Sequence, residues 1–314
     1  MAEPARRAPG VLERLRSGQV LVGDGAWGTQ LMERGLRPGE PPETFNLARP
    51  EVLEEIARAY LAAGADLVTT NTFGGSPARL AQRGLDGRTE EINRAAVEAV
   101  RRAVGGRAYV SASVGPSGHL LKPFGDGEPR EIFAGFQRQI GALAAAGADL
   151  ICIETMTDLA EALLAVRAAR AVAPALPVMV TLTFEQTRRG FFTVMGNPLA
   201  QAAAELGAAG AEILGSNCGN GSETMVEVAR ALRASTDRPI AIQPTAGLPE
   251  PRGGVTVYPE TPDFMAVQAR ALITAGVAIV GGCCGTTPEH IRALRAVADA
   301  AAPRPPHPGG TATP

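Results

Sequence analysis

The sequence has little lysine and little histidine. All but one of its 30 Lys and Arg residues are arginine, the exception being Lys122, and it has 3 histidines. An enzyme that forms a Schiff base needs a lysine in its site, and Lys122 falls in a predicted loop. Histidine metal sites are equally disfavoured, because His307 lies near the C-terminus, His290 belongs to a helix start and His119 to a solvated loop.

Excess charge and long apolar runs are also missing. The net charge is −2, so no basic surface points to nucleic acid or an anionic membrane. No apolar stretch reaches the roughly 18 residues of a membrane span. The first ten residues contain no apolar signal core, so we expect a cytoplasmic protein.

Cysteine is scarce, with 4 residues in 314. Four are too few for a disulfide scaffold, and no CxxC pair is present, which excludes an ordinary zinc ribbon or finger. In a reducing compartment such thiols indicate metal binding or catalysis.

Buried strands alternate with amphipathic helices along the chain. We predict eight strands, each followed by a helix or a helix-like segment. The strands are predicted at 20–24, 65–73, 108–114, 149–154, 178–184, 212–218, 239–243 and 277–282. The main helices are predicted at 50–63, 90–104, 131–146, 160–172, 198–209, 223–234 and 262–275.

A short repeat sets the register of these elements. Ala63-Gly-Ala-Asp-Leu67 recurs in similar form at 146–150, 209–213 and 275–279. Each copy reads as a helix end, a left-handed glycine and a buried strand, before strands two, four, six and eight. With no GxGxxG fingerprint, this pattern predicts an α/β fold, a single (β/α)8 TIM barrel at 11–302. We expect a flexible N-terminus at 1–10, a disordered tail at 303–314, and a lid-like loop at 116–129.

Three cysteines follow predicted strands at their C-terminal ends, where α/β barrels keep their chemistry. Cys218 follows strand six, while Cys283 and Cys284 follow strand eight. One strand separates the two sites, so the thiols can face one another and form a catalytic zinc centre with an open position. Three small buried residues, or a strained disulfide between Cys283 and Cys284, are the alternatives. Cys152 lies inside a strand and reads as a core residue.

Carboxylates stand at two other strand ends. Asp24 follows strand one and Glu154 follows strand four, and Thr70 belongs to the polar end of strand two. Capping or an ion pair would explain each carboxylate without a function. The alternative is recognition of a substrate ammonium, with the N–H groups of Gly25 and Ala26 free for a carboxylate.

The motifs that carry these residues resemble the homocysteine S-methyltransferase family, and most closely the homocysteine-binding module of cobalamin-dependent methionine synthases. The likeness covers roughly residues 11 to 300, and betaine-homocysteine methyltransferases are related. The matching stretches are Asp24-Gly-Ala-Trp-Gly-Thr29, Thr70-Asn-Thr-Phe73, Glu154-Thr155, Asn217-Cys-Gly219 and Gly281-Gly-Cys-Cys-Gly-Thr-Thr-Pro-Glu-His290.

The resemblance implies a barrel in which Cys218, Cys283 and Cys284 hold Zn²⁺. Homocysteine would place its amino-acid end near Asp24, Gly25, Ala26, Thr70 and Glu154. Its zinc-bound thiolate would attack a methyl donor and yield methionine. No general base is needed, which agrees with the shortage of histidine.

The methyl donor is less well defined. Thr155 and Gly74 stand where betaine-using relatives carry aromatic residues, which argues against betaine. We expect methylcobalamin on a separate corrinoid protein, or a small sulfonium such as S-methylmethionine, and 314 residues do not accommodate further cobalamin or folate domains. A non-catalytic zinc-stabilised barrel and a phosphate-binding barrel enzyme are the competing hypotheses. The sequence does not predict an oligomeric state.

Overall fold

The computed structural model describes residues 9–253 and 255–301, and within them eight parallel strands form one sheet in the order β1-β12-β9-β8-β5-β4-β3-β2. The two ends of this order meet through a parallel bridge between Gly23 and Leu67, which closes the barrel. The barrel strands are β1 (Leu21–Val22), β2 (Leu67–Thr69), β3 (Tyr109–Val114), β4 (Leu150–Met156), β5 (Val178–Leu182), β8 (Ile213–Asn217), β9 (Ile240–Gln243) and β12 (Val277–Val280). The predicted TIM barrel and its eight strands are confirmed.

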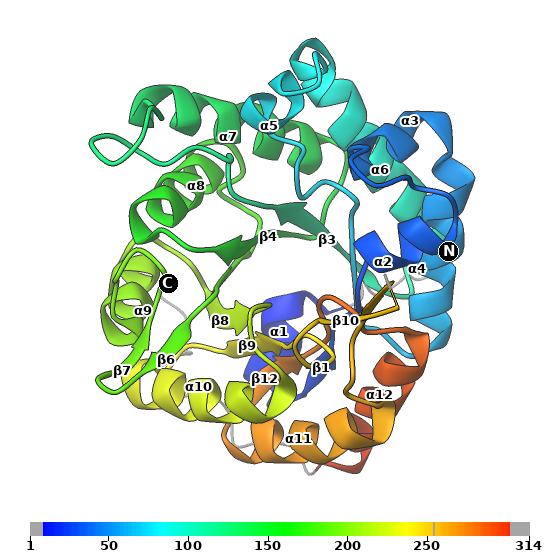
Figure 1. Cartoon of the computed structure of the whole chain (residues 1–314), viewed down its shortest axis with the longest axis vertical. Coiled ribbons are helices and arrows are strands. Elements are labelled where there is room, and N and C mark those ends of the chain that lie inside the picture. The colour runs from blue at the N-terminus through cyan, green and yellow to red at the C-terminus, as the bar shows by residue number, and fades with distance from the viewer. Residues whose placement is uncertain (1–8, 254, 302–314) are drawn as a thin grey trace, which may run out of the picture.

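Helices surround the barrel as a ring (Figure 1). Seven long helices agree with the predicted ranges to within two residues. The helices are α1 (Val11–Arg16), α2 (Gly28–Glu33), η1 (Pro42–Thr44), α3 (Phe45–Ala48), α4 (Pro50–Ala62), α5 (Pro77–Ala81), η2 (Asp86–Arg88), α6 (Thr89–Val104), α7 (Pro129–Ala145), α8 (Leu159–Val172), α9 (Leu199–Ala208), α10 (Ser222–Ser235), α11 (Pro262–Thr274) and α12 (Pro288–Ala300). No helix in the described ranges is long and apolar enough to cross a membrane.

The barrel interior is a packed core of side chains from alternate strand positions. Leu21, Leu67, Leu150 and Ile213 are fully or almost fully buried there, as aliphatic residues are in barrels of this kind. Helix α1 contributes Val11 and Leu15 to the same cluster and so covers the N-terminal end of the barrel. Cys152 lies in this cluster, 1 % exposed, which confirms its interpretation as a core residue.

The four glycines of the sequence repeat have the predicted left-handed backbone, with φ values of 97°, 93°, 109° and 89° at Gly64, Gly147, Gly210 and Gly276. The acidic residue that follows in the first three copies has a role that the sequence did not indicate. In each of these copies the carboxylate accepts a hydrogen bond from a backbone N–H of the preceding barrel strand. It also forms an ion pair with an arginine. The contacts are Asp66 with Val22 N (2.9 Å) and Arg295 (2.8 Å), Asp149 with Val110 N (2.7 Å) and Arg101 (2.8 Å), and Glu212 with Val178 N (2.7 Å) and Arg170 (2.8 Å).

Two short hairpins stand on loops at the C-terminal end of the barrel, and the sequence did not predict them. They are formed by β6 (Glu185–Thr187) with β7 (Gly190–Phe192) and by β10 (Glu250–Arg252) with β11 (Val255–Val257). The first follows β5 and the second follows β9. Both lengthen the rim around the strand ends, where barrel enzymes carry their loops.

The loop at 116–129 does not have the lid position that we expected. No residue of this segment lines the cavity at the strand ends. The loop folds on itself instead, with a bridge between Leu121 and Gly127 and an ion pair of 3.1 Å between His119 and Asp126. His119 is therefore a loop histidine, as predicted. The expected tail and most of the expected N-terminal segment lie outside the described residues.

Candidate active site

The C-terminal ends of the strands enclose a cavity of about 580 Å³. All eight residues that the sequence analysis selected line this cavity. These residues are Asp24, Gly25, Ala26, Thr70, Glu154, Cys218, Cys283 and Cys284. Strand ends up to 260 positions apart in the sequence, Asp24 and Cys284, thus contribute to one site, because parallel strands of a barrel all end at the same face.

Three thiols converge at one side of this cavity. The sulfur atoms of Cys218, Cys283 and Cys284 all lie within 4.8 Å of one another, and the Sγ atoms of Cys218 and Cys284 are 4.0 Å apart. A tetrahedral zinc site with Zn–S bonds of 2.3 Å separates its sulfurs by roughly 3.8 Å, so the three residues fit a zinc ion. Each is only partly buried, which leaves a fourth position open towards the cavity.

Strand β9 holds the two cysteine segments in place. It lies between β8 and β12 in the sheet, and its extension pairs with both. Cys218 N donates to Gln243 O (3.1 Å) on one side, and Cys283 N donates to Pro244 O (2.8 Å) on the other. The spacing of the sulfurs therefore follows from the spacing of neighbouring strands.

The pKa values of the three thiols are shifted in different directions. Hydrogen bonds from Cys218 and Cys283 lower the pKa of the Cys284 thiol to about 3, and burial opposes that shift. A hydroxyl group also contributes, since Tyr258 donates a hydrogen bond to the Cys284 sulfur. The pKa of the donating Cys283 thiol is raised well above its usual value, first by its hydrogen bond with Cys218. These hydrogen bonds favour the thiolate form at Cys284, which is the form that binds metal ions.

Asn217 fixes the backbone beside the thiols. Its side-chain oxygen accepts from Thr155 N and Thr181 Oγ1, both at 2.8 Å, and its nitrogen donates to Thr155 Oγ1 at 2.7 Å. Thr155 and Cys218 each have a φ of 58°, and in the described chain they are the non-glycine residues with positive φ. Such strain is common at functional sites, and here it stands beside Glu154 and at a cysteine of the cluster.

Asp24 is a buried carboxylate that is already well bonded. Its oxygens accept from Trp27 Nε1 (2.8 Å), Thr69 N (2.7 Å) and Thr69 Oγ1 (2.7 Å), so it joins the end of β1 to the end of β2. Burial raises its pKa to about 6 despite these donors. Asp24 thus braces the barrel and also faces the cavity.

Glu154 has fewer partners. Ser113 Oγ donates to its Oε1 oxygen, and burial raises its pKa to about 7, with the nearby charges of Asp24 and Cys284 adding to the shift. Two carboxylates and the thiol cluster therefore share one cavity. Arg79 and Arg83 also line it, but no cation is among the groups that shift the pKa of Asp24 or of Glu154. A positively charged group on a bound molecule would offset their mutual repulsion.

Two further predicted residues are partly engaged by the protein. Thr70 Oγ1 lies 2.6 Å from Thr72 Oγ1 and accepts from Ser113 N (3.1 Å), so one lone pair of its hydroxyl stays available. Ala26 N donates to Thr286 Oγ1 (3.1 Å), so this N–H is not free for a ligand, contrary to our expectation. No hydrogen bond within the described chain uses the N–H of Gly25.

Sequence reasoning missed two residues of the site. Gln243 is 7 % exposed and lines the cavity, and its Oε1 atom has no hydrogen-bond partner in the described structure. It ends the seventh barrel strand, so the strand-end rule applied to the other strands would have found it. Tyr258 follows the β10–β11 hairpin, and no pattern in the sequence places it beside Cys284.

His290 has the structural role predicted for it. Its Nδ1 atom accepts from Thr287 N (3.1 Å) at the start of α12, and its Nε2 atom donates to Glu260 O (3.0 Å). Both ring nitrogens are thereby used away from the thiols. The metal-binding group in the described residues is the cysteine cluster alone.

Similarity to known proteins agrees with this geometry. Residues 21–298 match the family model for homocysteine S-methyltransferase. The methionine synthases of Mycobacterium leprae (strain TN) and Mycobacterium tuberculosis (strain ATCC 25618 / H37Rv) are each 34 % identical, over 88 % and 89 % of this chain. The chain spans 24 % and 25 % of the length of these two relatives.

Solved structures give the same result. The metallated form of the homocysteine methyltransferase MmuM from Escherichia coli superposes with a TM-score of 0.76 at 25 % identity, covering 88 % of this chain and 96 % of that one. Its oxidized form gives a TM-score of 0.77 over 91 % and 98 % of the two chains. The chain belongs to the homocysteine S-methyltransferase family.

Proposed function

We propose that the protein is a zinc-dependent homocysteine S-methyltransferase that forms methionine. The observation that carries this proposal is the convergence of three cysteine sulfurs within 4.8 Å of one another in a cavity that Asp24 and Glu154 also line. Homocysteine matches both parts, because it carries a thiol at one end and an ammonium at the other. The metallated form of MmuM, the homocysteine methyltransferase named above, supports a metal in this family.

The chain's own residues would hold the substrate. Cys218, Cys283 and Cys284 supply three thiolate ligands and leave the fourth position to the homocysteine sulfur. When bound, Zn²⁺ supplies the charge that keeps a fourth thiol deprotonated at neutral pH. Glu154 and the free oxygen of Gln243 would accept hydrogen bonds from the ammonium, and the unused N–H of Gly25 would face the carboxylate.

Methyl transfer then needs no proton donor or acceptor from the protein. A new bond forms between the homocysteine sulfur and the methyl carbon, while the bond from methyl to donor breaks and its electron pair leaves with the donor. The site contributes orientation and the exclusion of water, which are large effects in a two-reactant displacement.

The cavity bears on the choice of donor. Its lining includes two aromatic residues, Trp27 and Phe73, and the Trp27 nitrogen is bound to Asp24. That is a poor cage for the quaternary ammonium of betaine. A corrinoid is too large for 580 Å³ and would present its methyl group at the mouth, carried by a separate protein. A small sulfonium would enter directly, drawn by the negative charges.

The metal assignment can be tested by single replacements. Cys218→Ala, Cys283→Ala and Cys284→Ala should each abolish tight zinc binding, because two thiolates leave an incomplete centre. Cys152→Ala is the matched control and should retain one zinc per chain, since Cys152 lies in the barrel core. The measurement is metal content after dialysis, and a fully zinc-loaded Cys283→Ala protein would refute the ligand set.

The ammonium contact has its own test. Glu154→Gln should weaken homocysteine binding by about 2 kcal/mol or more, roughly thirty-fold, because it removes one partner of a buried charged hydrogen bond. Glu161→Gln is the control, since Glu161 is also a glutamate with little solvent exposure but accepts from Ser117 N (2.7 Å) away from the cavity. Calorimetry on zinc-loaded protein gives both affinities, and equal weakening in the two variants would remove Glu154 from the substrate site.

The raised pKa of Glu154 predicts a pH dependence of stability in the zinc-free protein. A carboxyl whose pKa is about 7 when folded, against an ordinary 4.5, binds its proton more tightly in the native state. Its contribution therefore favours the fold at low pH and is lost as the pH rises from about 4.5 through 7.

Glu154→Gln removes this ionisation. Urea unfolding at pH 8 should find the variant more stable than the wild type, and the difference should shrink towards pH 5. A difference that grows at pH 5 would show that Glu154 is stabilised as the anion, contrary to its burial.

The donor is identified by measuring methionine formed from homocysteine with each donor alone. We expect turnover with methylcobalamin, slow when free and faster on a corrinoid protein, and none with betaine. Fast turnover with S-methylmethionine and none with methylcobalamin would instead identify a sulfonium-dependent enzyme. No methionine with any donor would favour a non-catalytic zinc barrel.

A further inference from the structure

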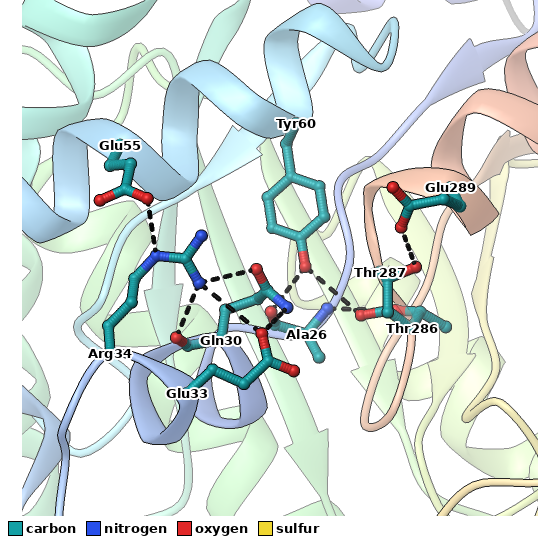
Figure 2. A network of polar contacts seen from close by, with 9 residues as sticks. All are labelled: Ala26, Gln30, Glu33, Arg34, Glu55, Tyr60, Thr286, Thr287 and Glu289. Carbon is teal, nitrogen blue, oxygen red and sulfur yellow. Dashed lines mark hydrogen bonds and ion pairs between the residues drawn. The ribbon is translucent and has the colours of Figure 1, made fainter.

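Tyr60 connects a surrounding helix to the floor of the active site. It lies on α4, it is 0 % exposed, and its hydroxyl donates to Ala26 O at 2.6 Å (Figure 2). A second, longer contact of 3.4 Å joins the same hydroxyl to Thr286 O. Burial raises the pKa of Tyr60 well above 10, so the hydroxyl keeps its proton and remains a donor.

The hydrogen bonds continue from Ala26 to the cysteine segment. Ala26 N donates to Thr286 Oγ1 (3.1 Å), and Thr286 Oγ1 donates to Cys283 O (2.7 Å). Thr286 is 0 % exposed. The β1–α2 loop and the cysteine segment are thus joined by one buried chain of bonds that begins at Tyr60.

The backbone at Gly25 and Gly282 lies in close contact with this chain of hydrogen bonds. A Cβ atom on Gly25 would lie 2.6 Å from Thr286 Oγ1 and 3.0 Å from the Tyr60 hydroxyl. A Cβ atom on Gly282 would lie 2.3 Å from Thr286 Oγ1. Glycine is required at both positions because the two segments and the Tyr60 hydroxyl are in close contact.

Helix α4 is also tied to α2 at the surface. Arg34 Nε donates to Glu55 Oε1 (3.2 Å), and Arg34 Nη1 donates to Gln30 O (3.0 Å), as Figure 2 shows. The β1–α2 loop is therefore bound to α4 through Tyr60, and the C-terminal end of α2 is bound to α4 through Arg34. Thr286 joins this loop to the cysteine segment.

We propose that Tyr60 and Thr286 are positioning residues that fix the distance between the amino-acid end of the substrate site and the thiol cluster. This inference rests on the proposed function. Homocysteine would span both parts, with its sulfur at the three cysteines and its amino-acid end at Glu154 and Gly25. A ligand that binds only at the metal has no need of this alignment.

Two thiols separate alignment from stability. Homocysteine has the amino-acid end, whereas 1-propanethiol has a similar sulfur chain without it. Both can be followed on Co²⁺-loaded protein, because thiolate coordination changes the visible absorption of the metal. The variants are Tyr60→Phe, which removes a hydroxyl, Thr286→Val, which replaces a hydroxyl with a methyl group, and Thr286→Ser, which retains the hydroxyl. Tyr109→Phe is the matched control, since Tyr109 binds Pro9 O (2.5 Å) at the opposite end of the barrel.

Tyr60→Phe and Thr286→Val should bind homocysteine about tenfold more weakly, the factor that corresponds to one net hydrogen bond. Their affinity for 1-propanethiol and their content of one metal per chain should not change. Thr286→Ser and Tyr109→Phe should behave as the wild type. In turnover assays the KM for homocysteine should rise while kcat at saturation is kept.

Failure of the positioning role and failure of the proposed function would give different results. Unchanged homocysteine affinity in Tyr60→Phe, or an equal loss for both thiols, overturns the positioning role and leaves the proposed function intact. A wild-type protein that responds to 1-propanethiol but binds homocysteine no more tightly refutes an amino-acid substrate, and the inference falls with it.

Discussion

The site depends first on the side-chain amide of Asn217. Its oxygen accepts two hydrogen bonds and its nitrogen donates to Thr155 Oγ1 and, at 3.8 Å, to Cys283 Sγ, so its full capacity is used within the protein. One residue thereby connects the ends of β4, β5, β8 and β12. It also holds two strained backbone positions that aim Cys218 and the segment after Glu154. Without this amide the residues would still be neighbours, but their directions would not be set.

Around that amide the cavity, which Arg79 and Arg83 also line, collects acidic groups. Asp24 is buried and Glu154 is half-buried, both with raised pKa values, and hydrogen bonds from two other thiols lower the pKa of Cys284. Such a cluster weakens the empty fold, since desolvated like charges repel. The same cluster would give a metal cation and a substrate ammonium two separate places in one cavity. Binding of both cations would then relieve the repulsion that destabilises the empty site.

Much of this arrangement could be predicted from the sequence. The barrel followed from the alternation of buried strands and amphipathic helices, and the repeated Ala-Gly-Ala-Asp pattern fixed which strand ends share a face. Convergence of the cysteines on strands six and eight needed only that topology. The rest depends on side-chain directions and loop paths that no local pattern encodes. The bond from Ala26 N to Thr286 spans 260 positions, the loop at 116–129 closes on itself, and Tyr258 reaches Cys284 from beyond an unpredicted hairpin.

The acidic residues at the opposite end of the barrel divide it into pairs of strands. Asp66 fastens β2 to β1, Asp149 fastens β4 to β3, and Glu212 fastens β8 to β5, each with an arginine. The last pair, β9 with β12, has Ala278 at the equivalent position. The quarter of the barrel that lacks this fastening is also the quarter that ends in Cys283 and Cys284. A metal ion held by those cysteines and Cys218 would join the end of β12 to the end of β8 across β9, and so would connect this quarter to the neighbouring pair at the opposite end of the barrel.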